Sequence, residues 1–119
     1  MNDIQVSTNF KLNEFQCRCG CQQVKLSSEL LERLQAMRTE TGRPIRVNSG
    51  YRCPAHNRAV GGATNSQHLH GTAADIVIVG LAKAQQDALC ERYFSDGGLG
   101  RMNTATHVDV RGHRARWTY

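Results

Sequence analysis

The chain has 119 residues, a net charge of +5 and 39% hydrophobic residues, which suits one compact domain with a single core. Its longest apolar run falls far short of the roughly 20 residues that cross a bilayer, so a membrane span is excluded. The positive charge suits an acidic partner, but aromatic residues make up only 6% of the chain, which argues against a base-stacking nucleic-acid surface.

The N-terminal segment is predicted to be an irregular arm of about eighteen residues. Its apolar anchors are Phe10, Leu12 and Phe15, and a cluster of cysteines follows at residues 17–21. The first five residues have neither the basic flank nor the apolar stretch of a signal peptide. We therefore expect another factor to carry the protein to any site of action outside the cytoplasm.

The first helix is predicted to begin at Ser27 or Ser28, because a serine side chain can accept a hydrogen bond from the first turn. Apolar residues at helical spacing form its inward face: Leu30, Leu31, Leu34 and Met37. Gly42 and Pro44 then end the helix. Residues 45–49 alternate between apolar and polar types and predict a short strand.

The middle of the chain is predicted to form a short helix, a loop and a buried strand. The helix begins at Pro54 and ends at Gly61 and Gly62. Residues 63–72 are polar and contain glycine, which indicates a long loop of the kind that often carries function. The apolar run over residues 73–79 is typical of a buried central strand.

The C-terminal third is predicted to form a second helix over residues 81–94 and two strands over residues 99–102 and 106–111. Four residues form the predicted inward face of the helix: Leu81, Ala84, Ala88 and Leu89. The basic cluster at the end is predicted to be a solvated tail: Arg111, His113, Arg114 and Arg116. Because helices and strands are mixed without a βαβ rhythm, we predict an α+β fold with a small, mostly antiparallel sheet.

Asp75 lies at the start of the buried strand, where a carboxylate needs a partner. An ordinary ion pair or cap is one explanation. A metal ion is the other, since His68 on the long loop and His107 within a later strand would complete a set of two histidines and one carboxylate. Catalytic zinc is commonly held by such a set, with water in the fourth position. The residues alone leave both explanations open.

Residues 66–75, with the sequence SQHLHGTAAD, resemble the SxHxxGxAxD signature of the zinc D-Ala-D-Ala carboxypeptidase family, which includes peptidoglycan-cleaving phage endolysins. Residues 48–54, with Asn57, and residues 107–111 also look like family segments in the expected order. The resemblance runs from about Phe10 to Trp117. It implies the hedgehog/DD-peptidase fold, with residues 1–119 forming a single zinc peptidase domain that includes a Cys-rich arm over residues 1–22.

The resemblance also implies a set of site residues. Three side chains would hold Zn²⁺: His68, Asp75 and His107. Arg52 would bind the carboxylate of the substrate or stabilise the oxyanion. Ser66 would support the site by hydrogen bonding, and His70 and Tyr51 are further candidates for substrate binding or support.

The general base is the point at which this sequence departs from the family. Members commonly have an acidic residue or a histidine two or three positions before the last zinc histidine, whereas this chain has Thr104 and Ala105. Asp109 shares a strand face with His107 and is the candidate catalytic base, the alternative being that it orients a ligand histidine. His70 and His113 are weaker candidates.

The cysteines allow three interpretations, all of which stay open. Four of them could meet in space: Cys17, Cys19, Cys21 and Cys53. A disulfide from Cys17 or Cys21 to Cys53 would join the arm to the segment that carries Arg52. The alternatives are a structural metal site and free thiols. Cys90, inside the second predicted helix, is interpreted as a buried small apolar residue.

The predicted function is hydrolysis, with Zn²⁺ as cofactor, of a peptide bond in peptidoglycan stem peptides or cross-links, as a D-Ala-D-Ala carboxypeptidase or a murein endopeptidase. The alternative is a non-catalytic zinc-binding module associated with the wall or with an assembly. We expect a monomer that binds the peptidoglycan peptide and no nucleic acid. Action on the cell wall without a signal peptide suits a phage lysis enzyme that a holin releases.

Overall fold

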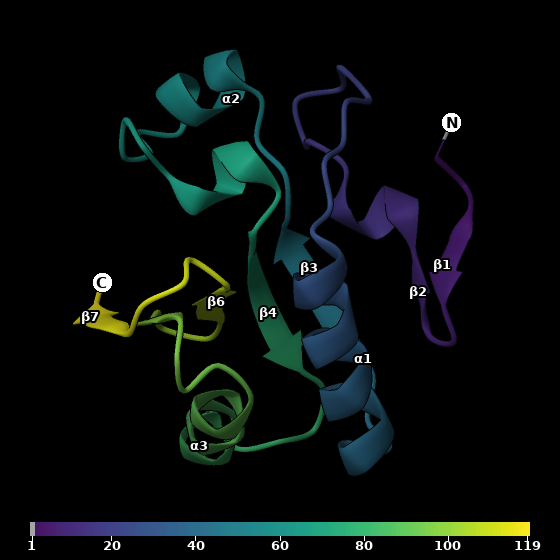
Figure 1. Ribbon diagram of the computed structural model, residues 1–119, viewed down its shortest axis with the longest axis vertical. Coiled ribbons are helices and arrows are strands. Elements are labelled where there is room, and N and C mark those ends of the chain that lie inside the picture. Colours follow the sequence, from purple (N-terminus) through teal and green to yellow (C-terminus); the bar gives the residue numbers. More distant parts are fainter. Residues whose placement is uncertain (1) are drawn as a thin grey trace.

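The computed structural model describes residues 2–119 and combines helices with a five-stranded mixed sheet (Figure 1), which confirms the predicted α+β class. The elements follow in this order: β1 (Gln5–Ser7), β2 (Phe10–Lys11), the 3-10 helix η1 (Leu12–Phe15), α1 (Ser28–Thr41), β3 (Ile45–Ser49), α2 (Pro54–Ala59), the 3-10 helix η2 (Gln67–His70), β4 (Ala73–Ile78), α3 (Lys83–Tyr93), β5 (Gly98–Arg101), β6 (Thr106–Asp109) and β7 (Ala115–Thr118). None of the helices in this range is long and apolar enough to cross a bilayer.

The main sheet has the strand order β3-β4-β6-β5-β7. Neighbouring strands are antiparallel except for β5 and β7, which are parallel. In the register, Asp75 on β4 lies between Ser49 on β3 and His107 on β6. The pairing of β4 with β6 therefore brings Asp75 and His107 together although 32 positions separate them in the sequence.

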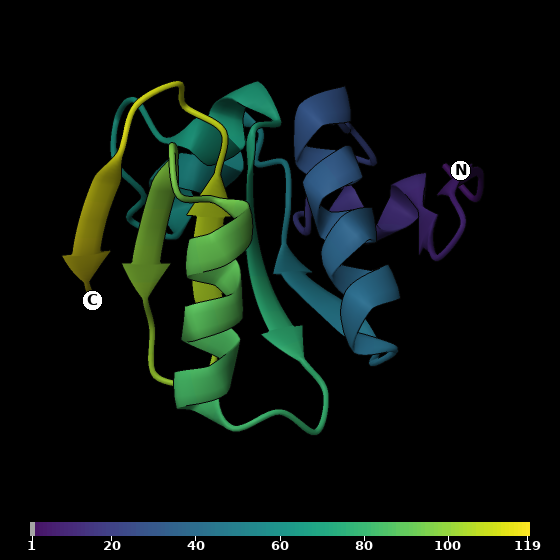
Figure 2. The same ribbon diagram turned by 60° about the horizontal axis from the view of Figure 1, so that its bottom comes forward.

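α1 begins and ends where the sequence predicts. The Ser27 side chain accepts a hydrogen bond from the backbone N–H of Leu30 at 3.3 Å, and Gly42 ends the helix in the left-handed conformation. The buried residues of its inward face are Leu30, Leu34 and Met37. α1 and α3 lie side by side on one face of the sheet (Figure 2).

The alternation of side chains along the strands separates the core from the opposite face of the sheet. Three β4 side chains lie in the core beneath the helices: Ala74, Ile76 and Ile78. Because successive side chains point to opposite faces, Asp75 points away from this core. On β6, Val108 lies in the core, so His107 and Asp109 share the face of Asp75. The fold thus places the candidate ligands on the face that α1 and α3 leave free.

Two segments predicted to be irregular have regular structure. β1 and β2 form a short antiparallel pair in the N-terminal arm, and Phe10 and Phe15 are buried in the core as expected. The long loop contains η2, whose first turn is capped by Ser66. Spacing patterns miss these elements because pieces of two to four residues are too short to show a period.

The inward face predicted for α3 is wrong in two positions, since Ala84 and Ala88 are exposed. The buried residues of the helix are Gln86, Leu89 and Cys90. Gln86 can be buried because its amide is hydrogen-bonded: it accepts from the backbone N–H of Ile78 at 2.8 Å and donates to the hydroxyl of Thr106 at 2.9 Å. A pattern based on hydrophobicity could not place this polar side chain in the core.

The prediction of a solvated C-terminal tail is also wrong, because residues 115–118 form the edge strand β7. The Arg116 guanidinium donates to the carbonyl groups of Phe94 and Gly97 and to the carboxylate of Glu91. Arg114 also binds Glu91 and the carbonyl group of Ser95. These contacts hold the tail against the end of α3.

We expect the Glu91 carboxylate to stabilise the docked tail in a pH-dependent way. Hydrogen bonds from Arg116, and then from Arg114, lower the pKa of Glu91 from 4.5 to about 2. A carboxylate whose pKa is depressed by folding stabilises the fold above its unfolded pKa, and this contribution is lost between pH 4.5 and about 2. The side chain is 37% exposed, so solvent screening limits the effect to under about 1 kcal/mol.

Denaturant unfolding at pH 7, about 4 and about 3 tests this. Glu91→Gln is expected to be less stable than the natural chain at pH 7 and to approach it at pH 3. Glu32→Gln is the control, because Glu32 is an exposed glutamate on another helix, α1. Equal pH dependence in the natural chain and Glu91→Gln would contradict the role given to Glu91.

Candidate metal centre

Three side chains from three different elements converge on the open face of the sheet. They are His68 from η2, Asp75 from β4 and His107 from β6. Each exposes 4% or less of its surface, and one potential ligand atom from each lies within 4.8 Å of the other two. Asp75 Oδ1 is 3.1 Å from His107 Nδ1 and 3.3 Å from His68 Nε2.

The outer nitrogen of each imidazole is held by an acceptor. His68 Nδ1 donates to the carbonyl group of Gly50 at 2.7 Å, and His107 Nε2 donates to Asp109 Oδ2 at 2.7 Å. An imidazole that donates from one nitrogen presents a lone pair at the other in its neutral form. The two nitrogens that face Asp75 are therefore free to act as ligands.

These contacts create a buried site that needs a cation. Within residues 2–119, His68 Nε2 is a buried side-chain polar atom with no hydrogen-bond partner. Two nitrogen lone pairs face a carboxylate oxygen, an arrangement that is repulsive unless a proton or a metal ion lies between them. Two imidazole nitrogens and a carboxylate are also the donors that zinc takes in catalytic sites. The donor set thus fits a zinc ion.

The charges around the site are strongly coupled. Burial raises the pKa of Asp75, but the adjacent His107 and His68 imidazoles outweigh it and hold that pKa below its usual range. Burial lowers the pKa of His107, but Asp109 and Asp75 more than offset this, so its pKa is raised. The site therefore keeps Asp75 ionised and favours positive charge beside it.

Asp109 is fully buried and makes hydrogen bonds through both oxygens. Oδ2 accepts from His107 and from Arg111 Nη2, and Oδ1 accepts from the backbone N–H of Gly98 and from Arg111 Nε. Burial raises the pKa of Asp109, but His107 and Arg111 lower it further than burial raises it. A side chain on residue 98 would collide with this carboxylate, which explains why glycine stands there.

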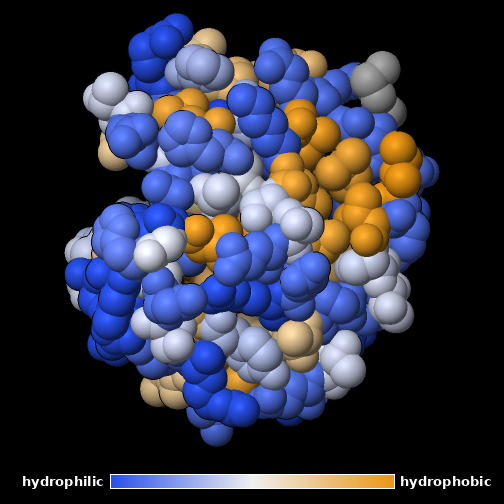
Figure 3. Space-filling view, in the orientation of Figure 1, coloured by the Kyte–Doolittle hydropathy of each residue, from blue (hydrophilic) through white to orange (hydrophobic). Residues whose placement is uncertain are grey.

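A cavity of about 620 Å³ opens above the three candidate ligands. Figure 3 shows the surface hollowed between the α2–η2 region and β7. Arg52 lines this cavity, with Nη2 3.5 Å from Asp75 Oδ2 and Nη1 3.3 Å from Asn57 Oδ1. A Cβ atom on Gly62 would collide with Asn57 and crowd Arg52, so this glycine lets the loop close over the guanidinium. The cavity thus offers a positive group beside the candidate metal position.

Residues 8–109 match the family model described as peptidase M15. The chain belongs to the peptidase M15 family. It is also similar to the zinc D-Ala-D-Ala carboxypeptidase of Streptomyces albus G, with 53% identity over 45 residues. This match covers 37% of the chain and only 18% of the length of that protein. The family resemblance recognised in the sequence is thereby confirmed.

Two aromatic residues of the cavity were not predicted from the sequence. Trp117 and Tyr119 line it from β7 and the chain end, and the Trp117 ring lies 5.0 Å from the His107 ring, centroid to centroid. The Arg111 guanidinium lies over the Trp117 ring at 4.9 Å, and Gly100 leaves room for the indole. The signal was present, because Trp117 and Tyr119 are two positions apart and so share a strand face.

The other predicted site residues divide into those near the cavity and those away from it. Ser66 lines the cavity and its hydroxyl accepts from the backbone N–H of His68 at 3.2 Å. Tyr51 is buried beside Cys17 and Cys53, and His70 is exposed and contacts Asn65, so neither is among the lining residues. Their predicted substrate roles stay predictions.

The five cysteines are free thiols in the structure. Four of them lie together between the N-terminal arm and the start of α2: Cys17, Cys19, Cys21 and Cys53. Cys90 faces the core of the domain from α3, buried as predicted, and burial raises its pKa to about 12. Thr104 and Ala105 lie in the turn between β5 and β6, where neither carries an ionisable side chain.

Proposed function

We propose that this chain is a zinc-dependent peptidase that hydrolyses a peptide bond in the stem peptides or cross-links of bacterial peptidoglycan. The observation that supports it most is His68 Nε2, which has no hydrogen-bond partner among the described residues and faces Asp75 in a buried site beneath an open cavity. His68, Asp75 and His107 would hold the ion. Membership of the M15 family and similarity to a zinc D-Ala-D-Ala carboxypeptidase support the reaction class.

Zinc bound in such a site lowers the pKa of a coordinated water and polarises a carbonyl group, which is the chemistry that hydrolysis of an amide requires. Arg52 would bind a carboxylate of the substrate, or the negative charge that develops on the carbonyl oxygen, because its guanidinium lines the cavity beside Asp75. Trp117 and Tyr119 would form an apolar wall for the peptide.

Asp109 would act as a positioning residue. Its contacts favour the alternative that Asp109 orients a ligand histidine, because it binds the nitrogen of His107 that faces away from Asp75. Such an outer carboxylate fixes the tautomer and orientation of a ligand histidine. The prediction that Asp109 is the general base stays untested, and a buried carboxylate with five donors around it is poorly placed to accept another proton.

The non-catalytic module is the second candidate. It is favoured by the lining of the cavity. Among the described residues that line it, Asp75 has the one carboxylate side chain, and Asp75 is already a candidate metal ligand. A chain with this site and no group to accept a proton would bind zinc and the wall peptide without hydrolysis. Location at the cell wall is part of both proposals.

Mass spectrometry of purified peptidoglycan after incubation with zinc-loaded protein distinguishes the two candidates. We expect loss of one defined peptide bond in the wild-type sample and no loss with His68→Ala or after chelation of the metal. The new chain ends identify the bond. Zinc bound at the site without any cleavage would contradict the peptidase and support the binding module.

A further inference from the structure

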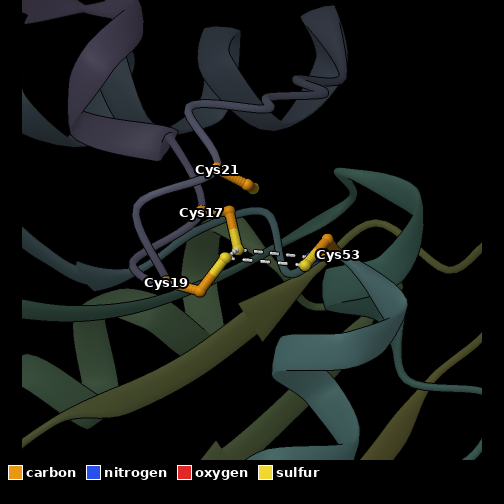
Figure 4. Close-up of side chains that lie close together, drawn as sticks. All are labelled: Cys17, Cys19, Cys21 and Cys53. Atoms are coloured by element: carbon orange, nitrogen blue, oxygen red, sulfur yellow. Dashed lines mark hydrogen bonds between the residues drawn. The ribbon is translucent and has the colours of Figure 1, made fainter.

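Four cysteines gather at a place that the proposed reaction does not use. Cys17, Cys19 and Cys21 follow η1 in the N-terminal arm, and Cys53 caps the start of α2. Figure 4 shows the sulfur atoms of Cys17, Cys19 and Cys53 turned toward one another, with Cys21 beside them. The separations are 3.4 Å from Cys17 to Cys19 and 3.7 Å from Cys19 to Cys53, and all four sulfurs lie within 4.8 Å of one another.

These separations match a tetrahedral metal site. Zinc–sulfur bonds of about 2.3 Å in a tetrahedron place the sulfur atoms about 3.8 Å apart. A disulfide needs a separation of about 2.05 Å and joins only two of the sulfurs. The structure instead brings four sulfurs within 4.8 Å of one another. Zinc is among the metals that soft thiolate ligands select.

Three of the four sulfurs accept hydrogen bonds from backbone N–H groups, as the sulfurs of metal–thiolate sites do. Cys17 Sγ accepts from the N–H of Cys53, and Cys53 Sγ accepts from the N–H of His56, both at 3.4 Å. Cys21 Sγ accepts from the N–H of Gln23 at 3.5 Å. Hydrogen bonds of this kind stabilise thiolate charge and orient the ligands of a metal.

The positive charge of Arg18, which lies between Cys17 and Cys19 in the sequence, does not neutralise the charge of the cysteine cluster. Arg18 turns its guanidinium to the carbonyl groups of Glu14 and Val47, each at 2.8 Å. Four thiolates without a cation would repel one another, whereas a divalent ion would compensate part of their charge. The cluster therefore has the ligands of a metal site, and the guanidinium group nearest to it in the sequence is bound to carbonyl groups instead.

The segment that carries Cys17, Cys19 and Cys21 has no regular secondary structure, and its apolar anchors Val24 and Leu26 follow the cysteines. Residues 16–27 contain neither helix nor strand, and residues 18–23 are exposed. Its buried apolar group is small, consisting of Cys17, Tyr51 and Cys53. A short irregular segment with so small a core is the setting in which proteins use a metal or a disulfide for stability.

We propose that Cys17, Cys19, Cys21 and Cys53 bind a second Zn²⁺ that has a structural role. With four protein ligands the site leaves no open position for substrate or water, in contrast to the three-ligand set beneath the cavity. The ion joins the N-terminal arm to the segment next to Arg52. That segment in turn donates from the backbone N–H of Arg52 to the carbonyl group of His68 at 3.1 Å, so the ion supports the geometry of the cavity from outside.

Metal content tests the proposal independently of peptidase activity. Protein purified under reducing conditions with zinc is expected to contain two zinc ions per chain. His68→Ala is expected to retain one, and Cys19→Ser combined with Cys21→Ser is expected to lose one, leaving the ion beneath the cavity. Cys19 and Cys21 are exposed, so their replacement leaves the core intact. Cys90→Ala, which alters a cysteine outside the cluster, is the control and is expected to retain both.

Cobalt substitution in His68→Ala identifies the ligands. We expect a strong thiolate-to-cobalt charge-transfer band that disappears in the triple variant that combines His68→Ala with Cys19→Ser and Cys21→Ser. Alkylation of the native zinc-loaded protein is expected to spare the four clustered cysteines until a chelator is added. A midpoint of thermal unfolding that falls on chelation in His68→Ala would support the structural role.

Three results would overturn the proposal. One is a single zinc ion per chain that His68→Ala abolishes. Another is an intact mass, measured in native zinc-loaded protein, that is lower by two hydrogen atoms and so reveals a disulfide in the cluster. The third is rapid alkylation of all four clustered cysteines in the presence of excess zinc. None of these results would contradict the proposed peptidase, whose activity is measured separately.

Discussion

Asp75→Asn is expected to cause the largest loss of metal from the site beneath the cavity. The substitution keeps the shape of the side chain but removes its charge, leaving two neutral imidazoles as ligands. Loss of an outer partner of a metal ligand costs about 10- to 100-fold in affinity, so loss of a direct anionic ligand should cost more than 100-fold. Hydrolysis of peptidoglycan should fall to the level of the chelated wild type.

Zinc affinity is measured by competition with a chromophoric chelator. The readout is the difference in affinity between the variant and the wild type, because the cysteine cluster, the proposed second zinc site, is the same in both proteins. Asp87→Asn is the matched control. Asp87 on α3 accepts from the Thr106 hydroxyl and pairs with Lys83, on the opposite face of the sheet from the site. Its replacement therefore disturbs β6, the strand of His107, without touching the ligands. Wild-type zinc affinity in Asp75→Asn would show that the metal binds elsewhere.

Asp109→Asn is expected to weaken zinc binding by about 10- to 100-fold. A carboxylate can accept all five hydrogen bonds that reach Asp109, whereas an amide presents an N–H₂ group to some of the same donors. If the amide nitrogen faces His107, the imidazole must protonate at Nδ1, the nitrogen that faces Asp75. That tautomer cannot bind a metal at the site.

The same variant decides between the two roles of Asp109. Reduced affinity with recovery of hydrolysis at saturating zinc would support a positioning role. Unchanged affinity together with a large loss of turnover would contradict it and favour the general base. Gly98→Ala provides an independent check, because the added methyl group would displace the Asp109 carboxylate without changing its charge. Circular dichroism of the metal-free proteins verifies that each variant is folded.

Local sequence patterns were sufficient for most elements of the fold. The Ser27 cap, the apolar spacing of α1 and the glycine at its end predicted that helix, and alternation predicted β3. The continuous apolar run predicted β4 as an internal strand. These patterns work because capping, helical spacing and strand alternation depend on residues that are close in the sequence.

Apart from the short elements β1, β2 and η2, the features that were missed depend on distant partners. β7 pairs in parallel with β5, so its strand conformation requires hydrogen bonds across the chain rather than a pattern of its own. Gln86 is buried because it satisfies polar groups of β4 and β6. Trp117 reaches the cavity only because β7 lies at the edge of the sheet next to the glycines of β5.

The class of fold, the family and the candidate ligands His68, Asp75 and His107 could be read from the sequence, since the motif that carries the ligands is a pattern of residue types at fixed spacing. Two features required the folded structure: Asp109 contacts the nitrogen of His107 that faces away from Asp75, and four cysteines from two distant segments meet. The physical reason is that strand pairing and loop packing set the direction of each side chain. Spacing along the chain does not contain that information.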